Sequence, residues 1–212
     1  MRSFVSCCYS SPSGKLIGDV VRRPYLLQDA AAIQKRVVEL AGDLSEALDS
    51  DAVVVGVLKG CLPFMADLLR SIDCGVEVDF LALTSFAPDS GRVRLTRDLA
   101  TDVTGRKVVL VEGVVDTGFR LDFLRRHLEA HDPSQIRVCT LFDRRDRRVL
   151  PVPVEYSGFV LEEGFVVGYG LDHRGMFRNL PVVISLDPSH LEVAPEDGKE
   201  LVNEVLRLAR EV

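Results

Sequence analysis

The segment from Val108 to Leu121, VVLVEGVVDTGFRL, places acidic, hydroxyl and glycine residues where a strand meets a helix. Its first four residues are apolar and predict a buried strand, which Glu112 ends. Asp116, Thr117 and Gly118 then lead into a helical pattern. Backbone N–H groups at a helix start, beside a hydroxyl and a glycine that permits close approach, can bind a phosphate monoester. The carboxylates of Glu112 and Asp116 at the mouth of this loop suit a ribose diol, a metal ion or a proton transfer.

These residue types also have a plainer explanation, because Asp and Thr are common helix caps. Asp116 and Thr117 would then serve only to satisfy the first amides of the following helix. The segment on its own does not separate a ligand site from a cap.

Alternating apolar strands and amphipathic helices must position these residues. The patterns predict helices over 29–48, 62–72 and about 120–130, and strands over 52–58, 76–83, 107–112 and 136–142. Strands that alternate with helices predict an α/β fold with a parallel sheet. Short strand-like stretches at 154–160, 165–170 and 182–186 predict an added edge or hood, and 195–212 predicts a terminal helix. Ligands of open α/β sheets bind beyond the carboxyl ends of the strands, so the residues directly after each strand are the candidates for chemistry.

Composition excludes several classes of protein. The chain has 212 residues, 47% of them hydrophobic and 27% charged, which predicts a globular protein with a sizeable core. The net charge of −6 argues against a nucleic-acid partner, because such binding normally needs a concentrated basic face. No apolar run reaches the roughly 18 residues of a membrane helix, so we expect no membrane association. The five cysteines show no CxxC or metal spacing, which favours a reducing, cytoplasmic location.

The domain organisation follows from the same patterns. We expect an N-terminal extension or edge segment over 1–28, a main domain with its hood over 29–188, and a C-terminal helical extension over 189–212. The first 18 residues lack the apolar region of a signal peptide and the several arginines of a transit peptide. We therefore expect a loose or strand-forming N-terminus.

Several motifs in order resemble one enzyme family. The sequence VVLVEGVVDTG resembles the phosphoribosyl-diphosphate motif of the type I phosphoribosyltransferases. The segments VLKGCLPFMADLL (57–69), SFAPDSGRVRLTRDL (85–99) and GFVVGYGLDHRGMFRNLPVVISLDP (164–188) are similar to the hypoxanthine-guanine members, especially the bacterial form. The similarity runs from about residue 52 to residue 188. It implies the type I phosphoribosyltransferase fold, in which a mainly parallel sheet flanked by helices carries a small hood subdomain.

The resemblance also implies a role for individual residues. The phosphoribosyl and phosphate group would lie against Glu112, Asp116, Thr117, Gly118, Phe119 and Arg120, with Asp116 also catalytic at the base. Pyrophosphate would bind at Leu58, Lys59, Gly60 and Arg178, and the Leu58–Lys59 peptide is usually cis in the family. A lid would begin at Ser85 and Phe86, and the purine would contact Arg144, Phe165, Val166 and Asp172. Magnesium would bind near Glu112 and Asp172.

Several of these roles have a structural alternative. Lys59 fits an ordinary exposed lysine after a strand, and the loop at Ser85 fits a flexible hairpin. Phe165 fits core packing, since aromatic residues are often buried. Asp172 and Arg178 each fit one half of a structural ion pair.

The chain departs from the family pattern at the centre of the motif. The family has two consecutive acids after the strand, whereas this chain has Glu112 and Gly113. Phe119 and Arg120 stand where a small or apolar residue and a threonine are usual, so Arg120 either binds the 5′-phosphate or blocks its pocket. Arg144 replaces the usual lysine, which changes the geometry of donation to a purine 6-oxo group. The lid has Phe86 in place of tyrosine.

The resemblance implies a magnesium-dependent transfer of phosphoribosyl from phosphoribosyl diphosphate to hypoxanthine or guanine, giving IMP or GMP and pyrophosphate. The departures favour an alternative, a weakened homologue that binds nucleotide as a regulatory protein. A third possibility is that Arg144 selects another oxopurine, such as xanthine. The family also implies a homodimer or homotetramer.

Overall fold

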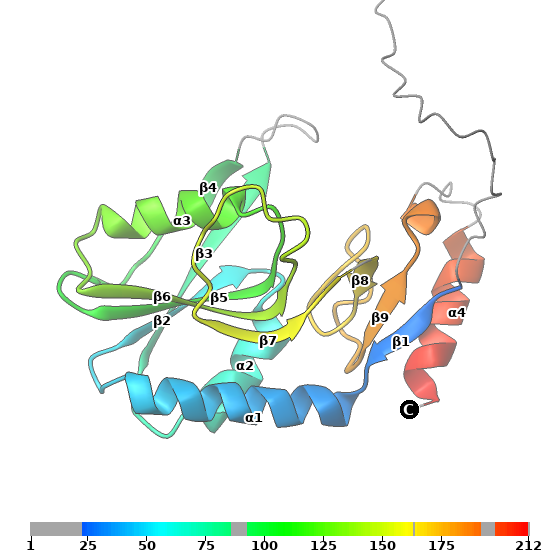
Figure 1. The fold of residues 1–212 in the computed structure, drawn as a ribbon, viewed down its shortest axis with the longest axis horizontal. Coiled ribbons are helices and arrows are strands. Elements are labelled where there is room, and N and C mark those ends of the chain that lie inside the picture. The colour runs from blue at the N-terminus through cyan, green and yellow to red at the C-terminus, as the bar shows by residue number, and fades with distance from the viewer. Residues whose placement is uncertain (1–22, 86–92, 163, 192–197, 212) are drawn as a thin grey trace, which may run out of the picture.

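The computed structural model describes residues 23–85, 93–162, 164–191 and 198–211, and their strands form two sheets (Figure 1). Among these residues, no helix combines the length and the apolar character needed to cross a membrane.

The larger sheet has six strands in the order β4-β3-β2-β5-β6-β7. Their bounds are β2 (Val53–Leu58), β3 (Glu77–Ser85), β4 (Val93–Arg97), β5 (Lys107–Val115), β6 (Gln135–Asp143) and β7 (Tyr156–Val160). All neighbouring pairs are parallel except β3 and β4, which form an antiparallel pair. The strands β2, β5 and β6 are central and almost wholly buried, as their continuous apolar runs predict. Because β2, β5 and β6 are parallel, their carboxyl ends lie at the same end of the sheet.

Helices cover both faces of this sheet. The helices α1 (Ala30–Ala47) and α2 (Leu62–Ser71) pack on the face that carries Val54 and Val109. The helix α3 (Phe119–Glu129) packs on the other face, against Val53 and Val108. Neighbouring residues of one strand thus point into two separate cores, because side chains alternate across a sheet.

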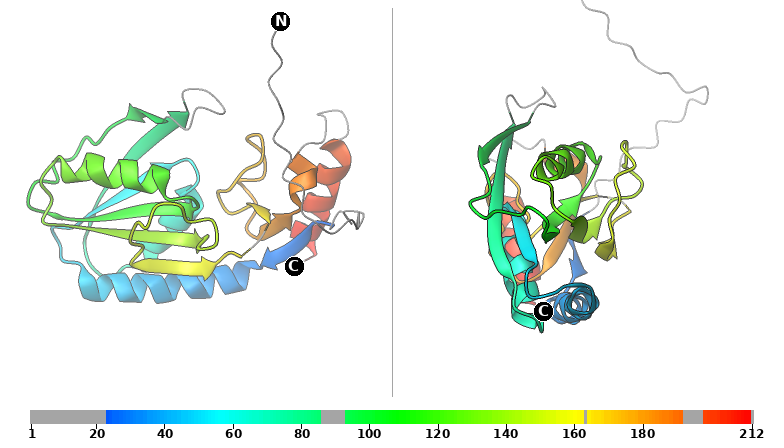
Figure 2. Two further views of the ribbon diagram at one scale, coloured as in Figure 1. Left: turned by 45° about the horizontal axis from the view of Figure 1, so that its top comes forward. Right: turned by 90° about the vertical axis from the view of Figure 1, so that its left-hand side faces the viewer.

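The smaller sheet forms the hood at one end of the molecule (Figure 2). Its antiparallel strands β1 (Tyr25–Gln28), β9 (Val183–Leu186) and β8 (Phe165–Val167) lie in that order. A 3₁₀ turn (Pro188–Leu191) follows β9, and the helix α4 (Gly198–Arg210) packs through Val205 into the hood core. Tyr169 and Leu171 join the core under α1 and α2, so the hood is continuous with the main domain.

The structure confirms the expected α/β fold with its mainly parallel sheet, flanking helices and hood. The strand β4 was not expected from the sequence. The stretches expected to form an added edge or hood divide between the two sheets, since 154–160 forms β7, an edge strand of the main sheet that pairs with β6, and the other two lie in the hood. The strand expected at 165–170 ends at Val167, because Gly168, Tyr169 and Gly170 all have positive φ and turn the chain.

The expected domain boundaries at residues 28 and 188 stay predictions. β1 precedes the first boundary and is hydrogen-bonded to β9 in the hood sheet. α4 follows the second boundary and packs on that sheet. Both ends of the described chain thus take part in the hood.

Candidate active site

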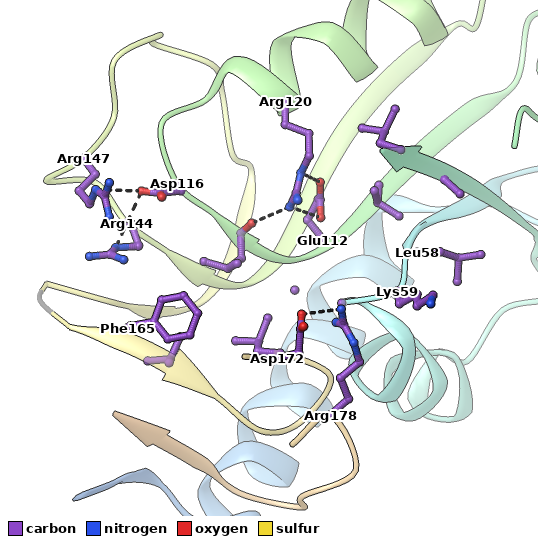
Figure 3. Close-up of a pocket in the computed structure, with 18 of the residues that line it drawn as sticks. Leu58, Lys59, Glu112, Asp116, Arg120, Arg144, Arg147, Phe165, Asp172 and Arg178 are labelled. Atoms are coloured by element: carbon purple, nitrogen blue, oxygen red, sulfur yellow. Dashed lines mark hydrogen bonds and ion pairs between the residues drawn. The ribbon is translucent and has the colours of Figure 1, made fainter. Parts of the chain in front are cut away.

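A cavity of about 630 Å³ opens at the carboxyl ends of β2 and β5, where the main sheet faces the hood (Figure 3). It brings together most of the residues that the sequence predicts for the site: Leu58, Lys59, Gly60, Glu112, Asp116, Arg120, Arg144, Phe165, Val166, Asp172 and Arg178. These residues come from four separate segments of the chain. The strand ends place the first three segments together, as expected for an open α/β sheet.

The loop after β2 forms one wall of this cavity. The peptide between Leu58 and Lys59 is cis, as the family resemblance implies. The side chain of Lys59 is exposed. The carbonyl of Gly60 packs so closely on Gly113 that a Cβ at residue 113 would lie 2.8 Å from the carbonyl oxygen. Glycine at position 113 is therefore required by the approach of the two loops.

Glu112 and Arg120 form a bidentate ion pair within the cavity. Arg120 donates from Nε to Oε1 and from Nη2 to Oε2 of Glu112, both at 3.0 Å. Glu112 is 3% exposed, whereas the Arg120 side chain is 48% exposed. Burial raises the pKa of Glu112, and the charge and hydrogen bonds of Arg120 oppose this rise. The guanidinium of Arg120 therefore binds Glu112 in this structure, and its role at the 5′-phosphate, as a ligand or as a blocking group, stays a prediction.

The loop from Asp116 to Gly118 leads into α3 as predicted. The N-cap residue is Gly118, with φ of 92°, and no side chain caps the helix. Capping by Asp116 or Thr117 therefore does not explain these residues. A second cavity of about 280 Å³, lined by Glu112, Asp116, Thr117, Gly118, Arg120 and Leu121, lies at this helix start. The first amides of α3 and the positive end of its dipole make this cavity suitable for a phosphate group.

Phe119 lines neither of these two cavities, and it is 54% exposed. Its predicted role in phosphate binding stays a prediction that no contact in the structure supports. Ser85 is the last residue of β3, and Phe86 lies outside the described residues, so the predicted lid stays a prediction as well.

The segment after β6 holds residues 116–118, the predicted phosphate loop, in place. Arg148 donates from Nε to the carbonyl of Asp116 at 3.0 Å and also pairs with the buried Asp143. The amides of Val149 and Leu150 both donate to the carbonyl of Thr117, at 2.9 and 3.0 Å. The loop conformation is therefore fixed by a neighbouring segment and not by a side-chain cap.

Arg144, Arg147 and Asp116 form a charged group in the cavity, opposite the ring of Phe165 (Figure 3). The Nε atoms of Arg144 and Arg147 lie 3.9 and 3.4 Å from Oδ1 of Asp116. Oδ1 of Asp116 and Nε of Arg144 are buried and make no hydrogen bond within the described chain. Since buried polar atoms are rarely left without partners, this place suits a ligand that supplies them.

Phe165 is half-buried at the start of β8, and its ring meets His173 edge-on with 5.9 Å between ring centroids. One part of the residue packs on the hood core, and the residue also lines the cavity. Val166 is buried beside it. Core packing and ligand contact are therefore both present at Phe165.

Asp172 and Arg178 form an ion pair on the hood side of the cavity. Nη2 of Arg178 lies 2.5 Å from Oδ1 of Asp172, and its Nη1 donates to the carbonyl of Gly170 at 2.6 Å. The other Asp172 oxygen accepts from the amide of Gly175 at 2.7 Å. Their side chains are about one-third exposed, so both can still meet a ligand in the cavity.

The two carboxylates predicted for magnesium differ in their fit to the ion. Carboxylate oxygens suit Mg²⁺, which usually binds one or two of them together with substrate phosphates. Asp172 faces the cavity and fits that arrangement. Glu112 has both oxygens engaged by Arg120, so it does not fit a metal ligand while this pair is closed.

Residue Arg147 was not predicted from the sequence, although it contacts Asp116. The basic run at Arg144, Arg145, Arg147 and Arg148 was the available signal. Such a run is usually a solvated surface, and its spacing does not say which arginine turns inward.

Comparison with known proteins finds several relatives of this chain. The phosphoribosyl transferase domain model matches residues 27–174. The chain is 39% identical over 164 residues to hypoxanthine-guanine phosphoribosyltransferase of Bacillus subtilis (strain 168), covering 76% of this chain and 91% of that protein. It is 37% identical over 155 residues to hypoxanthine-guanine-xanthine phosphoribosyltransferase of Tritrichomonas foetus, covering 71% of this chain and 85% of that protein.

A solved structure extends the agreement to the fold. The crystal structure of a hypoxanthine-guanine phosphoribosyltransferase from Bacillus anthracis matches with a TM-score of 0.73 and 35% identity, covering 78% of this chain and 99% of that chain. The expected type I phosphoribosyltransferase fold is thereby confirmed. The family model and these relatives show that the chain belongs to the phosphoribosyltransferase family.

Proposed function

We propose that this protein is a purine salvage enzyme that transfers the 5-phosphoribosyl group from phosphoribosyl diphosphate to hypoxanthine or guanine. The products are IMP or GMP and pyrophosphate. The observation that carries the proposal is a pair of buried atoms, Oδ1 of Asp116 and Nε of Arg144, that make no hydrogen bond within the described chain and lie opposite the ring of Phe165. A flat oxopurine matches this place, because its ring can stack on Phe165 while its edge atoms meet a carboxylate and a guanidinium.

The reaction breaks the bond between ribose C1 and the pyrophosphate oxygen and forms a bond from C1 to a base nitrogen. Positive charge develops on the ribose as pyrophosphate leaves, and the base nitrogen loses its proton as it attacks. Asp116 receives or relays this proton at the base. Lys59 and Arg178 offset the charge of the leaving pyrophosphate, and the amides at the start of α3 hold the 5′-phosphate.

Magnesium bound to the diphosphate, with Asp172 as its protein carboxylate, would supply further positive charge to the leaving group.

Binding of the ribose at Glu112 requires Arg120 to move. Glu112 can contact the ribose hydroxyls only after Arg120 has moved from its oxygens, since both oxygens accept from the guanidinium. The exposed half of the Arg120 side chain leaves room for that movement.

The test is turnover with phosphoribosyl diphosphate, Mg²⁺ and each of hypoxanthine, guanine and xanthine, with chromatographic identification of the nucleotide. We expect IMP and GMP. Formation of nucleotide from xanthine alone would change the base assignment, and no nucleotide from any base, beside an active control enzyme, would refute the proposal.

A second candidate function is a nucleotide-binding regulatory protein with weakened catalysis. The closed Glu112–Arg120 pair favours it, because this pair withholds the acid from the ribose. Calorimetry that shows tight GMP binding together with absent turnover would support this candidate. In that case Arg120→Ala, which frees Glu112, is expected to restore measurable turnover.

We also infer a homodimer or homotetramer in the cytoplasm. The family resemblance supports the assembly, and light scattering after gel filtration tests it. The described cysteines Cys61, Cys74 and Cys139 are all free thiols, which supports a reducing compartment.

A further inference from the structure

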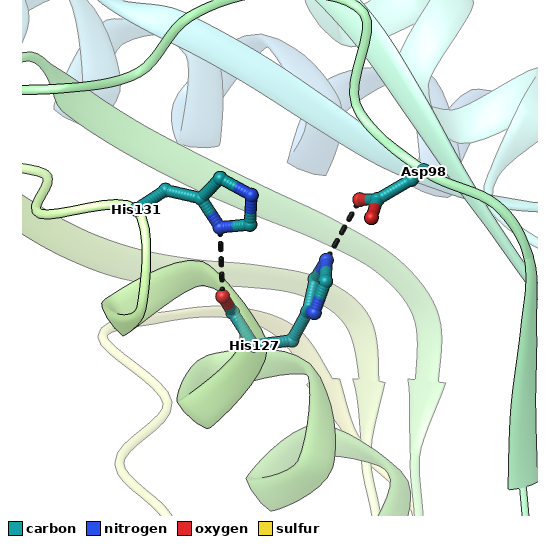
Figure 4. A group of neighbouring side chains, drawn as sticks. All are labelled: Asp98, His127 and His131. Carbon is teal, nitrogen blue, oxygen red and sulfur yellow. Dashed lines mark hydrogen bonds and ion pairs between the residues drawn. The ribbon is translucent and has the colours of Figure 1, made fainter.

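Two histidines and an aspartate meet at the end of α3 that lies opposite the phosphate loop (Figure 4). His127 lies in the last turn of α3, His131 follows the helix, and Asp98 comes directly after β4. One potential ligand atom from each residue lies within 4.8 Å of the other two. The proposed purine site uses none of them.

The hydrogen bonds of this cluster fix the state of one ring. Nδ1 of His131 lies 2.9 Å from the backbone carbonyl of His127. Because a carbonyl only accepts, Nδ1 carries the hydrogen, and Nε2 of a neutral ring keeps its lone pair. A histidine whose other nitrogen donates to a carbonyl is the usual arrangement of a metal ligand.

The second histidine is oriented by the carboxylate. Nε2 of His127 lies 2.7 Å from Oδ1 of Asp98. The His127 side chain is 23% exposed and that of Asp98 is 49% exposed, so the cluster is open to solvent. The two rings stand edge to face, with 5.0 Å between their centroids.

We propose that Asp98, His127 and His131 bind a divalent transition-metal ion of the Zn²⁺ type. Two imidazole nitrogens and one carboxylate oxygen are a donor set that Zn²⁺ accepts, with water as the fourth ligand. Mg²⁺ and Ca²⁺ prefer all-oxygen sites, so this site is chemically distinct from the magnesium of the substrate.

Binding requires only small side-chain movements. Ligand atoms about 2.0–2.1 Å from a tetrahedral zinc ion are about 3.3 Å from one another. The 2.7 Å contact between Asp98 and His127 must therefore lengthen slightly, and the widest separation must shorten. The hydrogen that Nε2 of His127 donates to Asp98 must also leave, either to solvent or to Nδ1 of the same ring, so that Nε2 can offer its lone pair to the ion. Asp98 and His131 are exposed and can rotate to achieve this. The bound ion would join the segment after β4 to the end of α3, and it would stabilise the folded state by ligand linkage.

The test is calorimetric titration of the metal-free protein with Zn²⁺ in the absence of substrates, with Co²⁺ absorption as a second readout. We expect one site, a rise in melting temperature with Zn²⁺, and reversal by a chelator. His131→Ala should weaken binding by roughly 10-fold or more, because it removes one ligand of three. His190→Ala is the matched control, since His190 lies in the 3₁₀ turn of the hood, and it should bind as the wild type does.

Other outcomes would overturn the proposal. Equal binding by the wild type and His131→Ala would show that the ion lies elsewhere, and loss of binding in a Cys7→Ser/Cys8→Ser variant would assign it to those thiols. A dissociation constant weaker than about 1 mM would leave only a surface histidine–aspartate pair. His131 is exposed, so its replacement tests the ligand without disturbing the core.

Discussion

Removal of Arg120 is expected to destabilise the protein mainly through Glu112, because the other hydrogen bond of its guanidinium, to the carbonyl of Val114 at 3.3 Å, is exposed. Arg120→Ala leaves a carboxylate that is 3% exposed without its two charge-assisted hydrogen bonds. Loss of a fully buried partner costs about 3–5 kcal/mol. The Arg120 side chain is 48% exposed, and water screens the pair on that side, so we expect about 2 kcal/mol.

A double-mutant cycle with Glu112→Gln isolates this interaction. With a neutral amide at residue 112, Arg120→Ala should cost less than about 0.5 kcal/mol, as for an ordinary surface change. The coupling free energy is then about 1.5–2 kcal/mol. For a domain of this size, 2 kcal/mol corresponds to a fall of about 4–8 °C in melting temperature.

The assay is chemical denaturation of the four proteins, followed by circular dichroism. Arg126→Ala on the same helix is the matched control, because Arg126 forms an exposed ion pair with Asp122 at 3.0 Å and is 76% exposed. We expect it to cost at most about 0.5 kcal/mol. An equal loss from Arg120→Ala in both backgrounds would refute the proposed role of the pair.

Four other changes have defined outcomes. Asp116→Asn should lower kcat by about 10²- to 10⁴-fold while the melting temperature changes little, since the side chain is 40% exposed. Phe165→Ala should raise the KM for the base roughly 10-fold and leave that for phosphoribosyl diphosphate unchanged, because stacking on an aromatic ring contributes about 1–3 kcal/mol per base. Gly113→Asp, which would supply the family's second acid, should lower activity in steady-state assays, because its Cβ would lie 2.8 Å from the Gly60 carbonyl oxygen. Burial of Asp79 opposes its ionisation, but backbone amide hydrogen bonds outweigh this and lower its pKa. The stability from Asp79 is thus present above the unfolded-state pKa of about 3.9 and is lost as pH falls through the lower folded-state pKa. The difference in melting temperature between wild type and Asp79→Asn should therefore narrow below about pH 4, and a constant difference would contradict this.

The central strands and the place of the site could be predicted from the sequence. Continuous apolar runs at 52–58, 107–112 and 136–142 identify strands that are buried on both faces, and their carboxyl ends then define the ligand edge. The polar strand β4 has a weak pattern, since one face of this edge strand is exposed, and it was not predicted. The sequence also did not indicate which sheet β7 joins, because the local pattern of an edge strand does not identify the strand with which it pairs.

The closed Glu112–Arg120 pair could not be predicted, because it depends on the conformation of two side chains eight residues apart. The sequence indicated only that Arg120 stood where the family has threonine. The packing of Gly113 on Gly60 was likewise hidden, since it arises where two loops distant in sequence approach each other. Gly113, which stands where the family has an acid, is therefore required by the packing of these two loops, and no local sequence motif indicates that packing.

A crystal structure of the protein with GMP and Mg²⁺ tests the proposed site most directly. We predict the purine on the ring of Phe165, its 6-oxo group at Arg144, the phosphate at the start of α3, and Arg120 moved from Glu112. A nucleotide bound elsewhere, or a phosphate position filled by Arg120, would contradict the proposed active site.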